Sequence, residues 1–202
     1  MKLPLVNTTL TVLLSGFVLM ASCKKNELNV STNDDYYIRF AFNGVQTEYT
    51  SQPFAGITTT NGMETMIIGA YKNFDVSSPL KEHISILIYN KTAIVPGGTY
   101  KDPVKVTAAN GTLVPQVIIT HYNSQETAFQ TVGIFSDENG VVTGSDLIPS
   151  LKNIRIDATV NVTELTADYA KGTFSGTSYQ ADSWINAVHQ PITNGSFFVK
   201  RQ

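Results

Sequence analysis

The chain contains very little cysteine, because Cys23 is the only one among 202 residues. A lone cysteine excludes a disulfide framework and a cluster of thiolate metal ligands. Since Cys23 lies near the N-terminus, the rest of the chain has no thiol that could serve as a nucleophile. Structure and chemistry must therefore come from other side chains.

Charged residues are also few, at 15% of the chain. Lys2 is the only charged residue before Cys23, so the part that begins at Cys23 holds 13 Lys and Arg against 16 Asp and Glu. A slightly acidic chain without a basic patch has no electrostatic attraction for nucleic acid. We therefore expect no nucleic-acid partner.

A long hydrophobic run is missing as well. The apolar run Leu10–Ala21 spans 12 residues, whereas a transmembrane helix needs about 20. Lys2 precedes this run and small residues follow it, which is the organisation of a secretory signal peptide. We predict that residues 1–22 are a signal peptide that is removed after export.

The end of this leader, Leu19-Met20-Ala21-Ser22-Cys23, resembles a lipobox, although Met20 departs from the usual Leu, Val or Ile. The resemblance implies that Cys23 carries acyl chains such as palmitate and anchors the protein to a membrane. An ordinary secretory signal with an incidental cysteine is the alternative. Residues 24–35 are polar without periodicity, so residues 23–35 are predicted to be the lipidated cysteine and a flexible tether. Residues 36–202 then form one domain.

The segment 36–49 has the pattern of a β-hairpin. Residues 36–42 and 45–49 alternate between apolar and polar positions. Asn43-Gly44 lies between them and supplies the two positive-φ residues of a type I′ turn. The expected register pairs Phe42 with Val45, Phe40 with Thr47 and Ile38 with Tyr49 on one face, and it leaves Arg39, Gln46 and Glu48 on the other.

The remaining segments are also typical of strands, because β-branched and aromatic residues recur between turn residues. The one short helix that the pattern allows is Asp182–His189, with Asp182 as its cap and Pro191 beyond its end. The chain is therefore predicted to be all-β, an antiparallel β-sandwich, with a β-barrel-like fold as the alternative. Strands are expected at residues 64–72, 83–89, 117–122, 128–132, 154–162, 169–179 and 196–200, and a turn at 96–100.

Four motifs resemble those of the small lipoproteins of unknown function that are common in Bacteroidota. They are Tyr-Ile-Arg-Phe-x-Phe-Asn-Gly at 37–44, Pro-Gly-Gly-Thr-Tyr at 96–100, Gly-Thr-Phe-Ser-Gly at 172–176 and Ile-Thr-Asn-Gly-Ser-Phe at 192–197. The resemblance extends over nearly all of residues 36–202. It implies a single β-sandwich-like domain in the cell envelope, and it implies no activity and no functional residues.

Sequence motifs for catalysis are absent. The three histidines, His83, His121 and His189, form no metal-binding spacing and are interpreted as polar or half-buried strand and loop residues. The chain also has no Gly-x-Ser-x-Gly, phosphate loop or dinucleotide fingerprint. We therefore expect a protein that is not an enzyme and that holds no cofactor.

Two segments offer binding hypotheses. Ser136–Asp146 contains Asp137, Glu138, Asn139 and Asp146, but Phe135 stands where an EF-hand requires aspartate, so a solvated turn is favoured over a calcium loop and no metal is expected. Trp184, the only tryptophan, and Tyr179 are candidate ligand-binding residues, since exposed aromatic rings stack on sugars. The alternative is that Trp184 fills one end of the core.

These observations predict a non-catalytic binding or structural lipoprotein, lipid-anchored at the outer membrane. Lys24 follows Cys23 at a position where aspartate often causes inner-membrane retention, which favours the outer membrane. Lys24–Glu27 partly matches a surface-export signal, so both the periplasmic and the cell-surface face of that membrane are alternatives. The expected partners are the membrane, through the lipid on Cys23, and a glycan or an envelope protein. The alternative function is a glycan-binding accessory lipoprotein of a nutrient-uptake system.

Overall fold

A computed structural model describes residues 36–108, 111–133, 136, 154–181 and 189–202. These residues form thirteen strands and no α-helix, so the all-β prediction is confirmed. The strands are β1 (Tyr37–Phe42), β2 (Val45–Tyr49), β3 (Ser51–Thr60), β4 (Met63–Tyr71), β5 (His83–Asn90), β6 (Gly98–Lys101), β7 (Lys105–Thr107), β8 (Leu113–Pro115), β9 (Val117–Tyr122), β10 (Ala128–Thr131), β11 (Thr159–Leu165), β12 (Tyr169–Gln180) and β13 (His189–Arg201).

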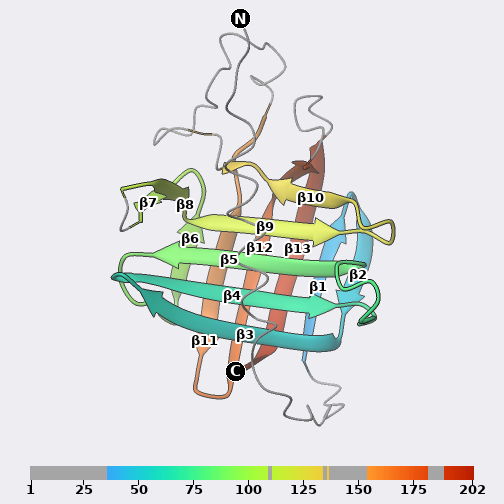
Figure 1. Ribbon diagram of the computed structural model, residues 1–202, viewed down its shortest axis with the longest axis horizontal. Helices are drawn as coiled ribbons and strands as arrows, with labels where there is room; N and C mark the ends of the chain where they lie inside the picture. Colours follow the sequence, from blue (N-terminus) through green and yellow to red (C-terminus); the bar gives the residue numbers. More distant parts are fainter. Residues whose placement is uncertain (1–35, 109–110, 134–135, 137–153, 182–188) are drawn as a thin grey trace, which may run out of the picture. The chain divides into compact units, whose positions relative to one another are not determined.

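Eleven strands belong to one sheet of order β2-β1-β13-β3-β4-β5-β9-β10-β12-β11-β6, and β7 and β8 form a small second sheet. Every pairing in the large sheet is antiparallel except that of β13 with β3. Figure 1 shows β3, β4, β5 and β9 in front of β11, β12, β13 and β1, which run across them. We call the first four strands the front layer and the strands β6, β11, β12, β13, β1 and β2 the back layer.

Two connections join the layers. At one side the end of β13 pairs with β3, through Lys200 with Phe54 and Arg201 with Ala55. At the other side β10 pairs with both β9 and β12. Because β12 and β13 also pair with each other, the pairings form a closed ring that runs through β13, β3, β4, β5, β9, β10 and β12.

The core lies between the layers and consists of one cluster of buried apolar side chains. Phe40 of β1 contacts Phe174 of β12 within its own layer and His121 of β9 across the gap, with ring centroids 5.9 and 5.3 Å apart. Ile86 and Ile119 approach from the front layer and are fully buried. Burial of this apolar surface is the main stabilising contribution to such a fold.

The predicted hairpin is confirmed in turn and register. Asn43 and Gly44 have φ of 48° and 79°, as a type I′ turn requires. Ile38 pairs with Tyr49, Phe40 with Thr47 and Phe42 with Val45. Ile38, Phe40 and Tyr49 are buried, whereas Val45 at the turn is 70% exposed.

The predicted strand at 154–162 is displaced, because β11 covers Thr159–Leu165. Arg155 and Asp157, just before it, are joined to β12 by hydrogen bonds that involve side chains. The Tyr179 hydroxyl accepts a hydrogen bond from the Arg155 backbone N–H at 2.7 Å, and the Asp157 carboxylate accepts two from Thr177. Such side-chain bonds replace ladder bonds and delay the start of a strand.

Other boundaries also differ from the prediction. The expected turn at 96–100 contains the start of β6, and the expected strand at 196–200 is the second half of β13. Strands β3, β7 and β8 were not predicted. The predicted helix at 182–189 lies outside the described residues except for His189, which begins β13.

The hairpin register makes a stability prediction. Phe40→Ala should cost about 3–5 kcal/mol in free energy of unfolding, because it empties a fully buried ring. Glu48→Thr should change stability by less than about 1 kcal/mol, since its ion pair with Arg39 lies between side chains 45% and 52% exposed. Denaturant unfolding of both variants measures the difference. Equal losses would contradict the assignment of the core face.

Candidate functional site

Four aromatic rings gather on the outer face of the back layer, and we call them the aromatic cluster: Tyr36, Tyr37, Tyr169 and Phe198. Phe198 is the centre, with its ring centroid 4.7 Å from that of Tyr36, 6.4 Å from Tyr37 and 5.3 Å from Tyr169. All four rings are half-buried. Large aromatic side chains that stay partly in water at a sheet face are typical of recognition surfaces.

The strand register explains how the cluster forms. Glu164 of β11 pairs with Lys171 of β12, Lys171 pairs with Phe198 of β13, and Phe198 pairs with Tyr37 of β1. Cross-strand partners on one face bring their Cβ atoms to about 5 Å. One row of side chains therefore crosses four adjacent strands, with charge at one end and aromatic rings at the other.

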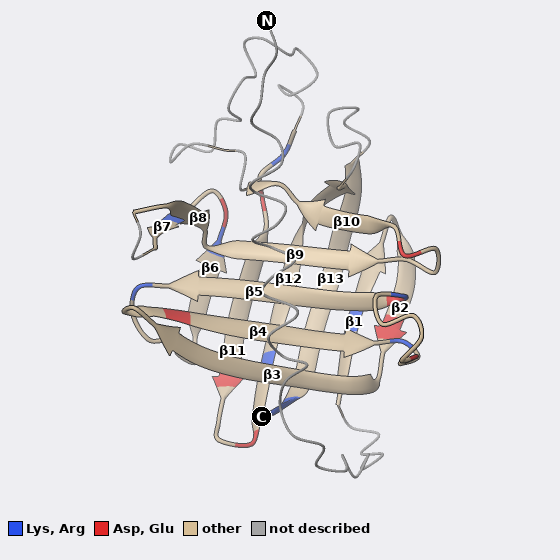
Figure 2. Ribbon diagram, in the orientation of Figure 1, with Lys and Arg blue, Asp and Glu red and all other residues tan. Residues whose placement is uncertain are grey.

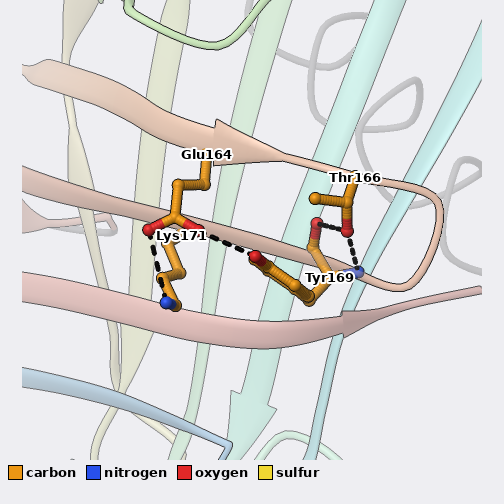
Figure 3. A network of polar contacts seen from close by, with 4 residues as sticks. All are labelled: Glu164, Thr166, Tyr169 and Lys171. Carbon is orange, nitrogen blue, oxygen red and sulfur yellow. Dashed lines mark hydrogen bonds and ion pairs between the residues drawn. The ribbon is translucent and has the colours of Figure 1, made fainter.

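Figure 3 shows the charged end of this row. The Glu164 carboxylate accepts a hydrogen bond from the Tyr169 hydroxyl at 2.8 Å. It also forms an ion pair with the Lys171 ammonium group, with Nζ and Oε1 3.3 Å apart. These bonds hold the pKa of Glu164 below its ordinary value, mainly through Tyr169, so the carboxylate is charged at neutral pH. The Lys171 ammonium also lies 4.8 Å from the Phe198 ring centroid and 5.2 Å from that of Tyr169.

A second row runs beside the first and is polar. The Thr99 hydroxyl donates to the Asn161 side-chain oxygen at 2.8 Å, and the Asn161 amide donates to the Thr173 hydroxyl at 3.1 Å. The same register continues through Ser196 to Arg39. Hydrogen-bonding side chains thus lie one row away from the aromatic cluster.

A different group, buried in the core, centres on His121. Its Nε2 is 2.9 Å from the Tyr49 hydroxyl, and its ring contacts Phe40, Phe42 and Phe129. Burial lowers the pKa of His121 to about 4, against a smaller opposite effect of Glu82, so the ring is neutral at pH 7. Burial also raises the pKa of Tyr49, so both partners of this hydrogen bond are uncharged at neutral pH.

His83 is buried at the opposite face of the front layer. Its ring stacks on Tyr71 with centroids 4.5 Å apart and lies 6.2 Å from Tyr122. Burial, with a smaller contribution from His121, lowers its pKa to about 4. Both histidines were expected to be half-buried or polar, and they are in fact only 2% and 5% exposed. His189, in contrast, is exposed at the start of β13.

Asp102 is an unusual buried carboxyl group. It is 4% exposed, and neither oxygen has a hydrogen-bond partner within the described part of the chain. Gly133 leaves the space that the carboxyl group occupies, because a Cβ there would lie 1.6 Å from Oδ2. Burial raises the pKa of Asp102 to about 7, although the Lys105 charge opposes this shift and the Asp157 charge adds to it.

Of the two residues predicted from the sequence to bind ligand, Tyr179 and Trp184, the structure describes Tyr179. Tyr179 is 1% exposed, and its hydroxyl bonds to the Arg155 backbone, so its ring offers no face to a ligand. Trp184, Cys23, the tether at 24–35 and Asp137, Glu138, Asn139 and Asp146 of the acidic loop lie outside the described residues.

The aromatic cluster was not predicted from the sequence. The strands that contribute to it were expected, although with different bounds. The signal was present in the pair Phe197-Phe198, where one residue must face outward if the other enters the core. Phe197 is buried and Phe198 is half-buried, as this alternation requires. The register between distant strands could not be read from the sequence.

Within residues 36–202, where described, no group of three or more His, Cys, Asp or Glu side chains is placed to hold a metal ion. The described part of the chain also contains no helix with the length and apolarity needed to cross a bilayer. Searches with the chain found no matching family model, no matching curated protein and no matching solved structure.

Asp102 predicts a pH-dependent stability difference. Its folded-state pKa, about 7, lies above the ordinary value near 4, so the folded state loses stability relative to the unfolded state as pH rises from about 4 to 7. Asp102→Asn removes this ionisation. The melting temperature of the variant relative to the unaltered protein should therefore rise between pH 4 and pH 8, as measured by thermal melts.

Asp75→Asn is the matched control for this experiment. Hydrogen bonds from Ser77 lower the pKa of this exposed carboxylate. Its contribution to stability is therefore present above the ordinary pKa and is lost at acid pH, so the control should show no gain on going to pH 8. The same pH dependence in both variants would contradict the burial of Asp102 as the cause.

The hydrogen bond between Tyr49 and His121 predicts coupling between these residues. Tyr49→Phe should cost about 1–3 kcal/mol in free energy of unfolding, because it leaves the buried Nε2 without its hydrogen-bond partner. In a His121→Leu background the same change should cost much less, since the hydrogen bond is already absent. Denaturant unfolding of the four proteins in this cycle tests the prediction, and equal costs in both backgrounds would refute it.

Proposed function

We propose that this protein is a non-catalytic lipoprotein of the cell envelope, anchored at the outer membrane by acyl chains on Cys23, with a binding or structural role. The observation that carries the proposal is the position of the only cysteine, which follows an apolar run of 12 residues and the small residue Ser22. An all-β domain is compatible with export and with a location outside the cytoplasm. The resemblance to small Bacteroidota lipoproteins supports the same assignment.

We further propose that the domain is a β-sandwich, with a β-barrel-like fold as the alternative. Two observations support it: core side chains approach from both layers, as Phe40 and His121 do, and the strands of the layers cross in Figure 1. Crossed layers joined at their corners by strands with irregular register form one class of sandwich. β13 fits that role, because it has register shifts against both β1 and β12 and pairs with β3 at its end.

A second candidate is the glycan-binding accessory lipoprotein of a nutrient-uptake system. A specific observation favours it, namely the half-buried aromatic cluster beside charged and hydrogen-bonding side chains. In this candidate function the aromatic cluster, and not Tyr179, is the sugar-binding surface, because the Tyr179 ring is inaccessible. In this reading the anchor on Cys23 keeps a glycan-capturing domain at the membrane.

The anchor is tested by changing Cys23 to Ser. The variant should lose incorporation of labelled palmitate and should move from the membrane fraction to the soluble fraction, because the thiol that forms the thioether to the lipid is gone. Ser22→Ala is the control, since it keeps both the cysteine and a small residue before it. If Cys23→Ser stays with the membranes after a high-salt wash, the proposed anchor is wrong.

A further inference from the structure

We infer that the aromatic cluster, with Glu164 and Lys171 at one end and the polar row of Asn161 and Thr173 beside it, binds a neutral oligosaccharide laid across strands β11, β12, β13 and β1. This inference rests on the second candidate function and identifies the ligand class and the residues of its site.

The first argument is the combination of side chains. A sugar ring presents an apolar C–H face and a rim of hydroxyl groups that both donate and accept hydrogen bonds. The cluster offers ring surface at Phe198 and Tyr169, an ionised acceptor at Glu164 and a charged donor at Lys171, all within one row of side chains. Charge-assisted hydrogen bonds are the stronger ones, and aromatic rings supply large contact area.

The charges beside the cluster are nearly balanced. Glu164 is paired with Lys171 and Arg39 with Glu48, and Lys200, which pairs with Tyr169 in the register, adds one exposed positive charge. An anionic polymer needs an excess of cations, which these pairs do not provide. A ligand without charge meets no such requirement, and its hydroxyl groups can bond to both members of a pair.

The third argument is geometry. The row Glu164, Lys171, Phe198 and Tyr37 takes one residue from each of four adjacent strands, so it extends over about 14 Å at the usual strand spacing. The row Asn161, Thr173, Ser196 and Arg39 runs beside it. An elongated platform with stacking surface along one side and hydrogen-bonding groups along the other suits a short linear chain of sugar rings.

The Lys171 side chain is expected to occupy different positions in the free and the sugar-bound protein. In the unliganded protein its ammonium group lies over Phe198 and Tyr169, where the attraction between a cation and a ring holds it. A sugar ring that stacks on Phe198 takes that place. The flexible side chain, 37% exposed, can then turn to donate to a hydroxyl group while it stays near Glu164.

The test is migration of the purified full chain in native gels that contain soluble neutral polysaccharides, namely hydroxyethyl cellulose, arabinoxylan, galactomannan or starch. At least one gel should retard the unaltered protein. Phe198→Ala should raise the apparent dissociation constant about tenfold or more, as expected for loss of a central aromatic contact. Glu164→Gln should weaken binding without affecting the fold, because this carboxylate is 46% exposed.

Two control variants lie on the loop that joins β4 to β5. Phe74→Ala removes an aromatic ring that is 38% exposed, and Lys72→Ala removes the lysine of another exposed ion pair. Both should migrate like the unaltered protein. Migration unchanged in every gel, or retardation that survives both Phe198→Ala and Glu164→Gln, would overturn the inference. Because this assay uses purified protein, it gives its answer whether or not Cys23 is acylated.

Discussion

The backbone pairing of β12 with β13 is the interaction on which the rest of the structure depends. These are the two longest strands, and ten residue pairs connect them. β13 also pairs with β1 and β3, and β12 with β10 and β11, so both ways of joining the layers pass through these two strands. Their register places Phe174 and Phe197 in the core and Lys171 and Phe198 outside. A slip of one residue would exchange the two faces, which explains why a single register determines both the core and the candidate site.

Local signals in the sequence were sufficient for the fold class and for the hairpin of β1 and β2. Asn43-Gly44 specifies its turn, and alternation specifies the buried face. The same turn recurs at Asn61-Gly62, with φ of 52° and 75°, between β3 and β4. β3 was missed because its sequence, rich in threonine and interrupted by Pro53 and Gly56, lacks clear apolar alternation. The partners of β13 lie far from it in the chain, so neither its length nor the aromatic cluster could be derived from local patterns.

Three buried titratable side chains affect how stability depends on pH, the two histidines in one direction and Asp102 in the other. His121 and His83 are neutral in the folded protein, so acid favours the unfolded state, in which they bind protons more readily. Asp102 is harder to ionise in the folded state, so the folded state loses stability through that residue as pH rises from about 4 to 7. His121 gains a hydrogen bond with Tyr49, whereas Asp102 gains only close packing against Gly133. The histidines and Asp102 therefore have opposite effects on stability within nearly the same pH range, between about 4 and 7.

The outer faces of the two layers differ in a way that bears on binding. In the front layer β3, β5 and β9 carry no acidic or basic residue other than histidine, and Figure 2 shows charge only near the strand ends. A row there joins Ile67, Leu87 and Ile118, and Ile118 is only 4% exposed. The back layer instead presents Glu164, Lys171 and Arg39 in water beside aromatic rings. A ligand with many hydroxyl groups loses bonds to water when it binds, and only a face with donors and acceptors can replace them. On the back layer, donors and acceptors of this kind lie directly beside the rings of the aromatic cluster.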